Sequence, residues 1–209
     1  PTRGLFRHCD RERMRSGKQS SDTAESTIIF AAADCTGHGV PGAMVSVVCH
    51  NAMNRSVREF GLRDPGEILD KTRELVVEQF QKSDEDVKDG MDIALCALHT
   101  NAESRRKNQD ARTILNYAGA HNPLWIIRNG EVLEIKATKR PVGKVDEPQP
   151  FQTHTIELEP GDSIYIFSDG YADQFGGAKG KKYKYKAFQK FLMQISDLSD
   201  DDQLKALKN

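Results

Sequence analysis

The sequence predicts an α+β fold in which helices lie on packed, mainly antiparallel β-sheets. Apolar runs of strand length in the middle of the 209-residue chain are separated by short turns, which join antiparallel strands. Helical patterns occur in pairs, instead of alternating with single strands. Counting these segments gives about seven strands and four helices. Helices layered on sheets are therefore expected, and not a βαβ fold.

The composition limits the classes of function. A chain that is 37% hydrophobic and 29% charged can build one domain with a real core. A net charge of −1 gives no global field for nucleic acid. The four cysteines (Cys9, Cys35, Cys49 and Cys96) form no CxxC pair, which indicates a reducing, cytoplasmic environment. No apolar run approaches the ~20 residues of a membrane span, and no signal peptide is recognisable.

Residues 1–26 are rich in arginine and show no helical or strand period. We expect this segment to be poorly ordered, and a basic arm that binds nucleic acid is the less favoured alternative. The folded domain is expected over residues 27–209.

The chain is organised around one strand and the loop that follows it. The uninterrupted apolar run Ile28–Ala33 is typical of a strand buried on both faces, and Asp34 stands at its end. Gly37 and Gly39 flank His38 and permit a tight loop beside the acid. The order is therefore strand, acid, glycine turn and helix.

Three interpretations of this segment remain open at this point. It can be an ordinary strand-to-helix turn, because turns are rich in glycine and aspartate. It can be a phosphate-binding loop, although its spacing matches neither GxGxxG nor GxxxxGK[ST]. It can also be a hard-metal site, since the Asp34 carboxylate and a nearby backbone carbonyl supply the oxygen ligands that magnesium and manganese prefer.

The remaining elements follow in order. A helix is expected over residues 41–60, with Pro41 in its first turn and Gly61 as its C-terminal cap. The next helix starts at Asp64-Pro65-Gly66-Glu67, where an N-cap acid precedes proline, and its apolar stripe reaches Phe80. Strands are then expected over residues 91–99, 113–119, 124–128, 132–135, 151–158 and 163–167, and helices over 188–195 and 199–208.

A second acid repeats the first design. The apolar strand 163–167 ends in Ser168-Asp169-Gly170, and Asp173 follows closely. If Asp34 and Asp169 converge, they form an oxygen-rich site for two divalent cations about 3.5–4 Å apart, which can bind phosphate and activate water. His38 and His121 are further candidates, but a lone histidine beside glycine is more often structural.

The sequence resembles the PPM-type serine/threonine phosphatases of the bacterial sporulation stage II protein E class. Five motifs recur in the family's order over roughly residues 28–195: Asp34–Ala43, Tyr117–Leu124, Pro141–Gly143, Pro160–Asp162 and Ser168–Gly170. The run Asp173-Gln174-Phe175-Gly176-Gly177 resembles the branch whose members carry an N-terminal sensor or repeat module.

The resemblance implies a sandwich of two mainly antiparallel sheets flanked by helices. It also implies hydrolysis of phosphoserine or phosphothreonine by water activated at a two-metal site holding Mn2+ or Mg2+. Asp34, the carbonyl of Cys35 and Asp169 would be metal ligands, with Asp92 and Asp173 as outer ligands. The glycines Gly37, Gly39 and Gly170, together with His38, would shape the phosphate-proximal loops. The implied partner is a phosphorylated signalling protein such as an anti-sigma-factor antagonist.

The chain departs from the family pattern at both ends. The acid of the family's first strand has no match in residues 1–27, and the late strand with paired aspartates is not found before Asn209. We therefore expect a domain incomplete at its C-terminus, with one cation or fewer tightly bound. The alternative function is a catalytically inactive phosphoprotein-binding regulatory module of the same fold.

A lysine-rich loop follows the second acid. Residues 176–186 are expected to form a mobile basic loop. Lys181 and Lys182 could attract an acidic phosphoprotein by speeding its encounter with the site, the alternative being a solvated loop without such a role.

Overall fold

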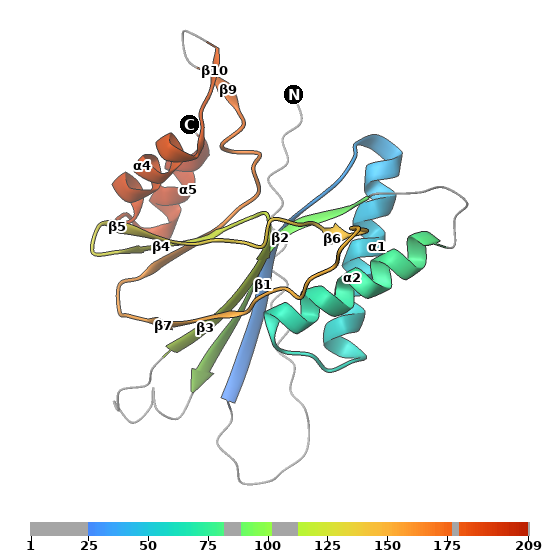
Figure 1. The fold of residues 1–209 in the computed structure, drawn as a ribbon. Helices are drawn as coiled ribbons and strands as arrows, with labels where there is room; N and C mark the ends of the chain where they lie inside the picture. Colours follow the sequence, from blue (N-terminus) through green and yellow to red (C-terminus); the bar gives the residue numbers. More distant parts are fainter. Residues whose placement is uncertain (1–24, 82–88, 102–112, 177–179, 209) are drawn as a thin grey trace.

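The computed structural model describes residues 25–81, 89–101, 113–176 and 180–208, which form two helix pairs around stacked sheets (Figure 1). The helices are α1 (Gly39–Arg58), α2 (Pro65–Gln81), α4 (Tyr185–Ile195) and α5 (Asp200–Lys208). The strands are β1 (Glu25–Cys35), β2 (Gly90–Asn101), β3 (Thr113–Ala120), β4 (Leu124–Arg128), β5 (Glu131–Ile135), β6 (Val142–Gly143), β7 (His154–Leu158), β8 (Ser163–Ile166), β9 (Phe175–Gly176) and β10 (Lys181–Lys182).

The strands form two main sheets with antiparallel pairing. The first sheet has the order β1-β2-β3-β7, and the short β6 also pairs with β2. The second sheet has the order β5-β4-β8. A third, two-stranded sheet joins β9 and β10. The predicted hairpin at Asn129-Gly130 is confirmed, because both residues adopt positive φ between β4 and β5.

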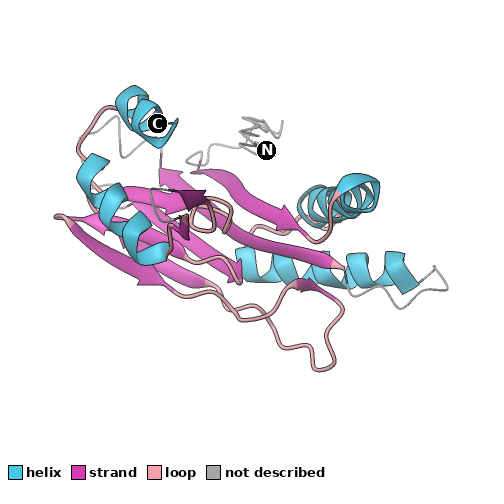
Figure 2. Cartoon of the chain, turned by 90° about the horizontal axis from the view of Figure 1, so that it is seen from above, coloured by secondary structure: helices cyan, strands magenta, loops and turns pink. Residues whose placement is uncertain are grey.

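Alternation along the strands builds three apolar layers. In β2, Ile93 and Leu95 belong to the cluster under α1 and α2, whereas Ala94 and Cys96 belong to the cluster between the two sheets. In β4, every second side chain, beginning with Leu124, faces the first sheet, and the others pack with α4 and α5. Figure 2 shows the strands lying between the two helix pairs. The predicted α+β sandwich is confirmed.

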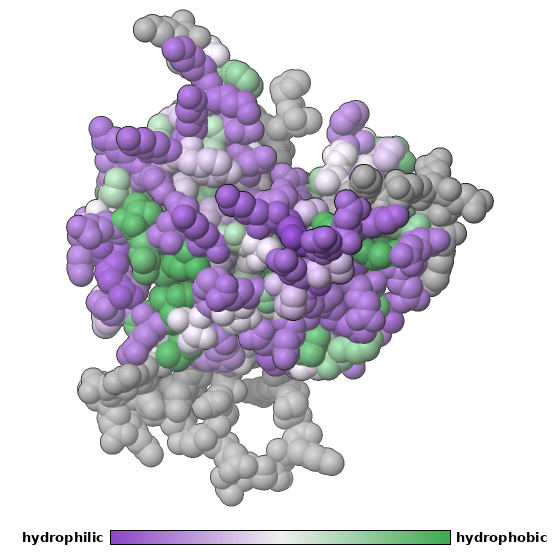
Figure 3. Space-filling view, in the orientation of Figure 1, coloured by the Kyte–Doolittle hydropathy of each residue, from purple (hydrophilic) through white to green (hydrophobic). Residues whose placement is uncertain are grey.

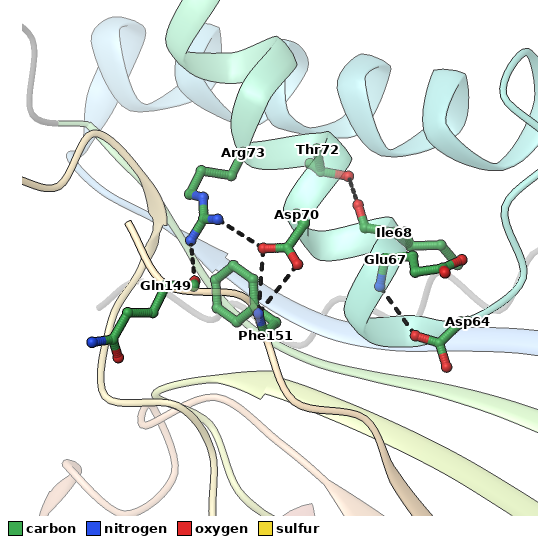
Figure 4. Close-up of polar contacts among 8 residues, drawn as sticks. All are labelled: Asp64, Glu67, Ile68, Asp70, Thr72, Arg73, Gln149 and Phe151. Atoms are coloured by element: carbon green, nitrogen blue, oxygen red, sulfur yellow. Dashed lines mark hydrogen bonds and ion pairs between the residues drawn. The ribbon is translucent and has the colours of Figure 1, made fainter. Parts of the chain in front are cut away.

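Helix α2 is held to the sheet side of the domain by polar contacts (Figure 4). Asp64 Oδ1 accepts a backbone N–H from the first helical turn, which confirms the predicted start of this helix. Asp70 accepts the N–H of Phe151 at 3.3 Å and an N–H of Arg73 at 2.7 Å. Arg73 also donates to the carbonyl of Gln149 at 2.8 Å. These bonds fasten the segment before β7 along α2.

Strand β1 is not buried on both faces, and that expectation is wrong. It pairs with β2 alone among the described strands and ends the order of its sheet. Ile28 is 52% exposed, and Asp34 is also exposed. An apolar run does not report how many neighbours a strand has, so an edge strand of small residues looks like a central one.

Three further expectations need correction. The strand expected over residues 151–158 begins at His154, because Phe151 binds α2. The strand expected over 163–167 ends at Ile166 and is half-buried throughout, since its sheet has only three strands. Part of the expected basic loop forms β9 and β10, and α4 begins at Tyr185, ahead of the predicted residue 188.

The face shown in Figure 3 is mostly hydrophilic, and its apolar side chains gather in the region between β5 and β7. Among the described residues, no helix combines the length and apolar character required to cross a membrane. The expectations for residues 1–24 lie outside the described residues.

Candidate active site

Three aspartates share one end of the sandwich. Asp34, next to last in β1, lies directly opposite Asp92 of β2 in the antiparallel register. Although the residue is exposed, partial burial of the Asp34 carboxyl raises its pKa, and the charges of Asp169 and Asp92 raise it further. Asp169 follows β8 in the other sheet. The fold therefore brings the two predicted strand-end acids, Asp34 and Asp169, close enough to interact electrostatically, and it adds Asp92 beside them.

The loop after Asp34 is fastened to the start of β2. The Thr36 N–H donates to the carbonyl of Gly90 at 3.0 Å. The Thr36 hydroxyl donates to Asp89 Oδ1 at 2.8 Å and accepts the Gly90 N–H at 3.1 Å. These bonds hold the end of β1 and the start of β2 together, and so fix where Asp34 stands relative to Asp92.

The glycines of this loop are required by its shape. Gly37 has φ of +88° and Gly39 has φ of +64°, which side chains rarely tolerate. A Cβ on Gly42 would lie 2.8 Å from the carbonyl oxygen of Gly37, so the loop rests directly on the first turn of α1. His38 is the exposed N-cap residue of α1, and its ring makes no capping hydrogen bond. Its predicted role near a phosphate stays a prediction.

His121, a candidate that the sequence left as more often structural, has a defined partner at the site. Its Nδ1–H donates to Asp92 Oδ1 at 2.9 Å. His121 has a positive φ of 58°, and its backbone N–H donates to the carbonyl of Thr138 at 2.9 Å. The motif Tyr117–Leu124 places the histidine directly after β3 and next to β2.

The rest of that motif is a close-packed turn. Tyr117 is fully buried, and its hydroxyl donates to the carbonyl of Asn122 at 2.7 Å. A Cβ on Gly119 would collide with this hydroxyl and would lie 2.6 Å from the Asn122 oxygen. The turn therefore requires glycine at this position, and it presents His121 to Asp92.

Asp173 and the predicted lysines form a separate cluster beside Asp169. The Asp173 N–H donates to the carbonyl of Asp169 at 2.9 Å, which closes the turn containing Gly170. The Asp173 carboxylate accepts from Lys182 Nζ at 2.7 Å. Lys181 is exposed in β10. This carboxylate already has a cationic partner, and the outer-ligand and steering roles remain predictions.

Cys35 directs its side chain away from the acids. It packs with the cluster under α1, and a hydrogen bond from the Cys49 thiol lowers the pKa of Cys35. Its backbone carbonyl, predicted as a metal ligand, is not tested by these contacts.

The carboxylates at this end of the sandwich are the type of ligand that a hard divalent cation prefers. The carboxylates of Asp34, Asp92 and Asp169 supply oxygen ligands, which magnesium and manganese prefer. Partial burial and then repulsion from the neighbouring acids raise the pKa of Asp34, and a bound cation would offset both effects. Within the described ranges, no three His, Cys, Asp or Glu side chains are close enough together to hold a metal ion on their own.

Comparisons with known proteins agree with this architecture. The family model described as Stage II sporulation protein E (SpoIIE) matches residues 24–209. The structure of the SiaA-PP2C domain of Pseudomonas aeruginosa is similar with a TM-score of 0.70 and 26% identity, over 88% of this chain and 71% of that one. No curated protein matches.

Two further solved structures share the fold at lower identity. The RsbU and RsbW domains of Rv1364c from Mycobacterium tuberculosis match with a TM-score of 0.62 and 18% identity, over 87% of this chain and 46% of that one. The PP2C phosphatase domain of SpoIIE from Bacillus subtilis, solved with a fragment of its regulatory domain, matches with a TM-score of 0.55 and 16% identity, over 88% and 51%. The chain thus spans about half the length of these two.

Proposed function

This chain belongs to the stage II sporulation protein E family of PPM-type phosphatases, and we propose that it hydrolyses phosphoserine or phosphothreonine in a protein substrate with the help of a divalent cation. The observation that carries the proposal is the meeting of Asp34, Asp92 and Asp169 at one end of the two sheets.

In this proposal Asp34 and Asp169 hold Mn2+ or Mg2+, and Asp92 is an outer ligand. When bound, such a cation polarises the phosphoryl group and lowers the pKa of water. His121 has a positioning role, because its Nδ1–H fixes the orientation of the Asp92 carboxylate. The Thr36 contacts hold Asp34 opposite Asp92 and limit the freedom of both groups.

Phosphate release from a phosphoserine peptide tests the proposal. Release should require added manganese or magnesium, and EDTA should abolish it. Asp34→Asn and Asp169→Asn should each reduce kcat/KM by at least about 100-fold, because an amide is a far weaker ligand than a carboxylate. Asp146→Asn, at an exposed position in the loop before β7, is the matched control and should leave turnover unchanged. Full activity in EDTA would overturn the metal requirement.

A second function is a phosphoprotein-binding module without turnover. It is favoured by the absence, within the described residues, of a three-ligand cluster close enough to hold a metal. In that case the chain should bind a phosphopeptide, release no phosphate with either metal, and show no heat of manganese binding by calorimetry. We propose a signalling phosphoprotein such as an anti-sigma-factor antagonist as the partner in both cases. Support comes from relatives solved with an RsbW domain or with part of a regulatory domain.

A further inference from the structure

A pocket of about 370 Å³ lies beside the candidate active site. His121 forms one side of it, and the aromatic rings of Trp125 and Tyr185 contribute apolar wall. Lys136 and Lys139, from the segment after β5, add two positive charges. A volume of this size is at the lower end of the range for small-molecule sites, and it can take one or two side chains of a peptide.

A single side chain, that of His121, connects the pocket with the aspartates of the candidate active site. His121, on its wall, donates to Asp92 at 2.9 Å. The Trp125 ring packs against Phe167 with ring centroids 4.3 Å apart, and Phe167 precedes Asp169 by two residues. A phosphorylated residue held at the acids would therefore place its neighbour in the peptide at the pocket.

Trp125 carries a hydrogen-bond donor that the folded chain leaves unused. The residue is only 1% exposed, and its Nε1 has no hydrogen-bond partner among the described residues. An indole N–H can only donate, and buried donors are nearly always paired in native proteins. Since Trp125 lines the pocket, an acceptor brought by a ligand would complete its bonding.

The charges around the pocket favour an anion. Neither Lys136 nor Lys139 forms an ion pair with a described residue of this chain, so their charges are available to a ligand. The one acidic wall residue, Glu134, accepts a hydrogen bond from Gln189 of α4 at 3.2 Å, which holds its carboxylate toward that helix. The charges of Asp169, Asp173 and Asp92 reach the wall residue Tyr185 from the side of the candidate active site. The pocket therefore combines two unpaired lysines with an indole whose N–H has no partner among the described residues.

We infer that this pocket recognises an acidic side chain next to the phosphorylated residue of the protein substrate. The inference rests on the proposed function for the identity of the substrate. A carboxylate suits the site because it can accept from Trp125 Nε1 and pair with Lys136 or Lys139, while the aromatic walls contact its methylene groups. The phosphate itself would lie at Asp34 and Asp169 with the cation, so the two anions occupy different places.

Binding to the pocket can be measured without turnover. Trp125 is the single tryptophan of the chain, so its fluorescence reports on this site alone. The full chain would be titrated with two peptides that have alanine in place of the phosphoserine and either aspartate or asparagine beside it. The aspartate peptide should change the fluorescence and bind at least about fivefold more tightly, as expected for ion pairs at a partly exposed site.

Variants then test the named residues. Lys136→Ala combined with Lys139→Ala should remove the preference for aspartate, whereas Lys190→Ala, on the exposed side of α4, should retain it. Trp125→Phe should lower kcat/KM for a phosphopeptide with a flanking aspartate more than for one with asparagine. Thermal unfolding of each variant would show that it is folded.

The outcomes separate this inference from the proposed function. Equal affinity for both peptides, or an aspartate preference that survives loss of both lysines, would overturn the inference. A preference for aspartate in a chain that releases no phosphate would retain the pocket and refute the phosphatase activity. Phosphate release without any flanking preference would retain the phosphatase activity and refute the role of the pocket.

Discussion

Gly119→Ala should destabilise the turn that carries His121 by about 3 kcal/mol. The added Cβ would collide with the buried Tyr117 hydroxyl and would stand 2.6 Å from the carbonyl oxygen of Asn122. Overpacking a core position costs about 1–3 kcal/mol, and losing the 2.7 Å bond between Tyr117 and Asn122 costs about 1 kcal/mol more. That is a large fraction of the ~5–15 kcal/mol that stabilises a typical domain.

A double-mutant cycle with Tyr117→Phe shows whether the hydroxyl is the cause. Tyr117→Phe alone should cost about 1–1.5 kcal/mol, since it leaves the Asn122 carbonyl without its donor. In the double variant the hydroxyl no longer collides with the new Cβ, so the total should fall short of the sum by about 1 kcal/mol. Urea unfolding followed by the fluorescence of Trp125 measures all three free energies.

Two results would refute this account of the turn. One is a Gly119→Ala variant within about 0.5 kcal/mol of the parent, which is the range of an ordinary surface substitution. The other is strict additivity in the double variant. If the account holds, Gly119→Ala should also lower kcat/KM, because a displaced turn moves His121 away from Asp92, and Tyr117→Phe should do so less.

Three further predictions follow from charges. In EDTA, Asp34→Asn should raise Tm by a few degrees because it removes the cost of partly burying a charge and the repulsion from Asp169 and Asp92. Manganese should raise Tm of the parent but not of this variant. The hydrogen bonds from Arg128 hold the pKa of Asp162 below its usual range. This carboxylate therefore stabilises the fold above pH 3.8, and its contribution is lost as the pH falls through the folded pKa. Asp162→Asn should make the midpoint of urea unfolding depend less on pH in the acid range. Reversing the charges of Lys181 and Lys182 should reduce kcat/KM on a phosphoprotein but not on an aryl phosphate, and high salt should shrink the loss; equal losses would exclude steering.

The sequence predicted the parts of the fold that local patterns encode. The hairpin at Asn129-Gly130, the capped start of α2 and the strand-end positions of Asp34 and Asp169 were all recognisable, because turn chemistry and apolar runs are local. The exposure of β1 was not recognisable, since it depends on which strands lie beside it. The pairing of residues 175–176 with 181–182 was missed because its strands are only two residues long.

The candidate site shows the same division between local and long-range information. Asp92 was expected as an outer ligand, yet the register of β1 and β2 sets it directly opposite Asp34. The Thr36 contacts with residues 89–90 secure the end of that pairing, and no spacing in the sequence reveals them. The sequence could name the acids of each strand, but only the pairing of the strands decides which of them meet.

The pocket and the acid cluster depend on a single turn. His121 belongs to both, because its ring donates to Asp92 and also lines the pocket. Its positive φ and the absence of a Cβ at Gly119 place the ring there. A change in this turn should therefore alter hydrolysis and the preference for an acidic flank together, whereas a change at Lys136 or Lys139 should alter the preference alone. Both kinds of variant would be compared on the same pair of phosphopeptides. If the turn variant changes only hydrolysis or only the preference, the pocket and the acids are independent sites and do not share His121.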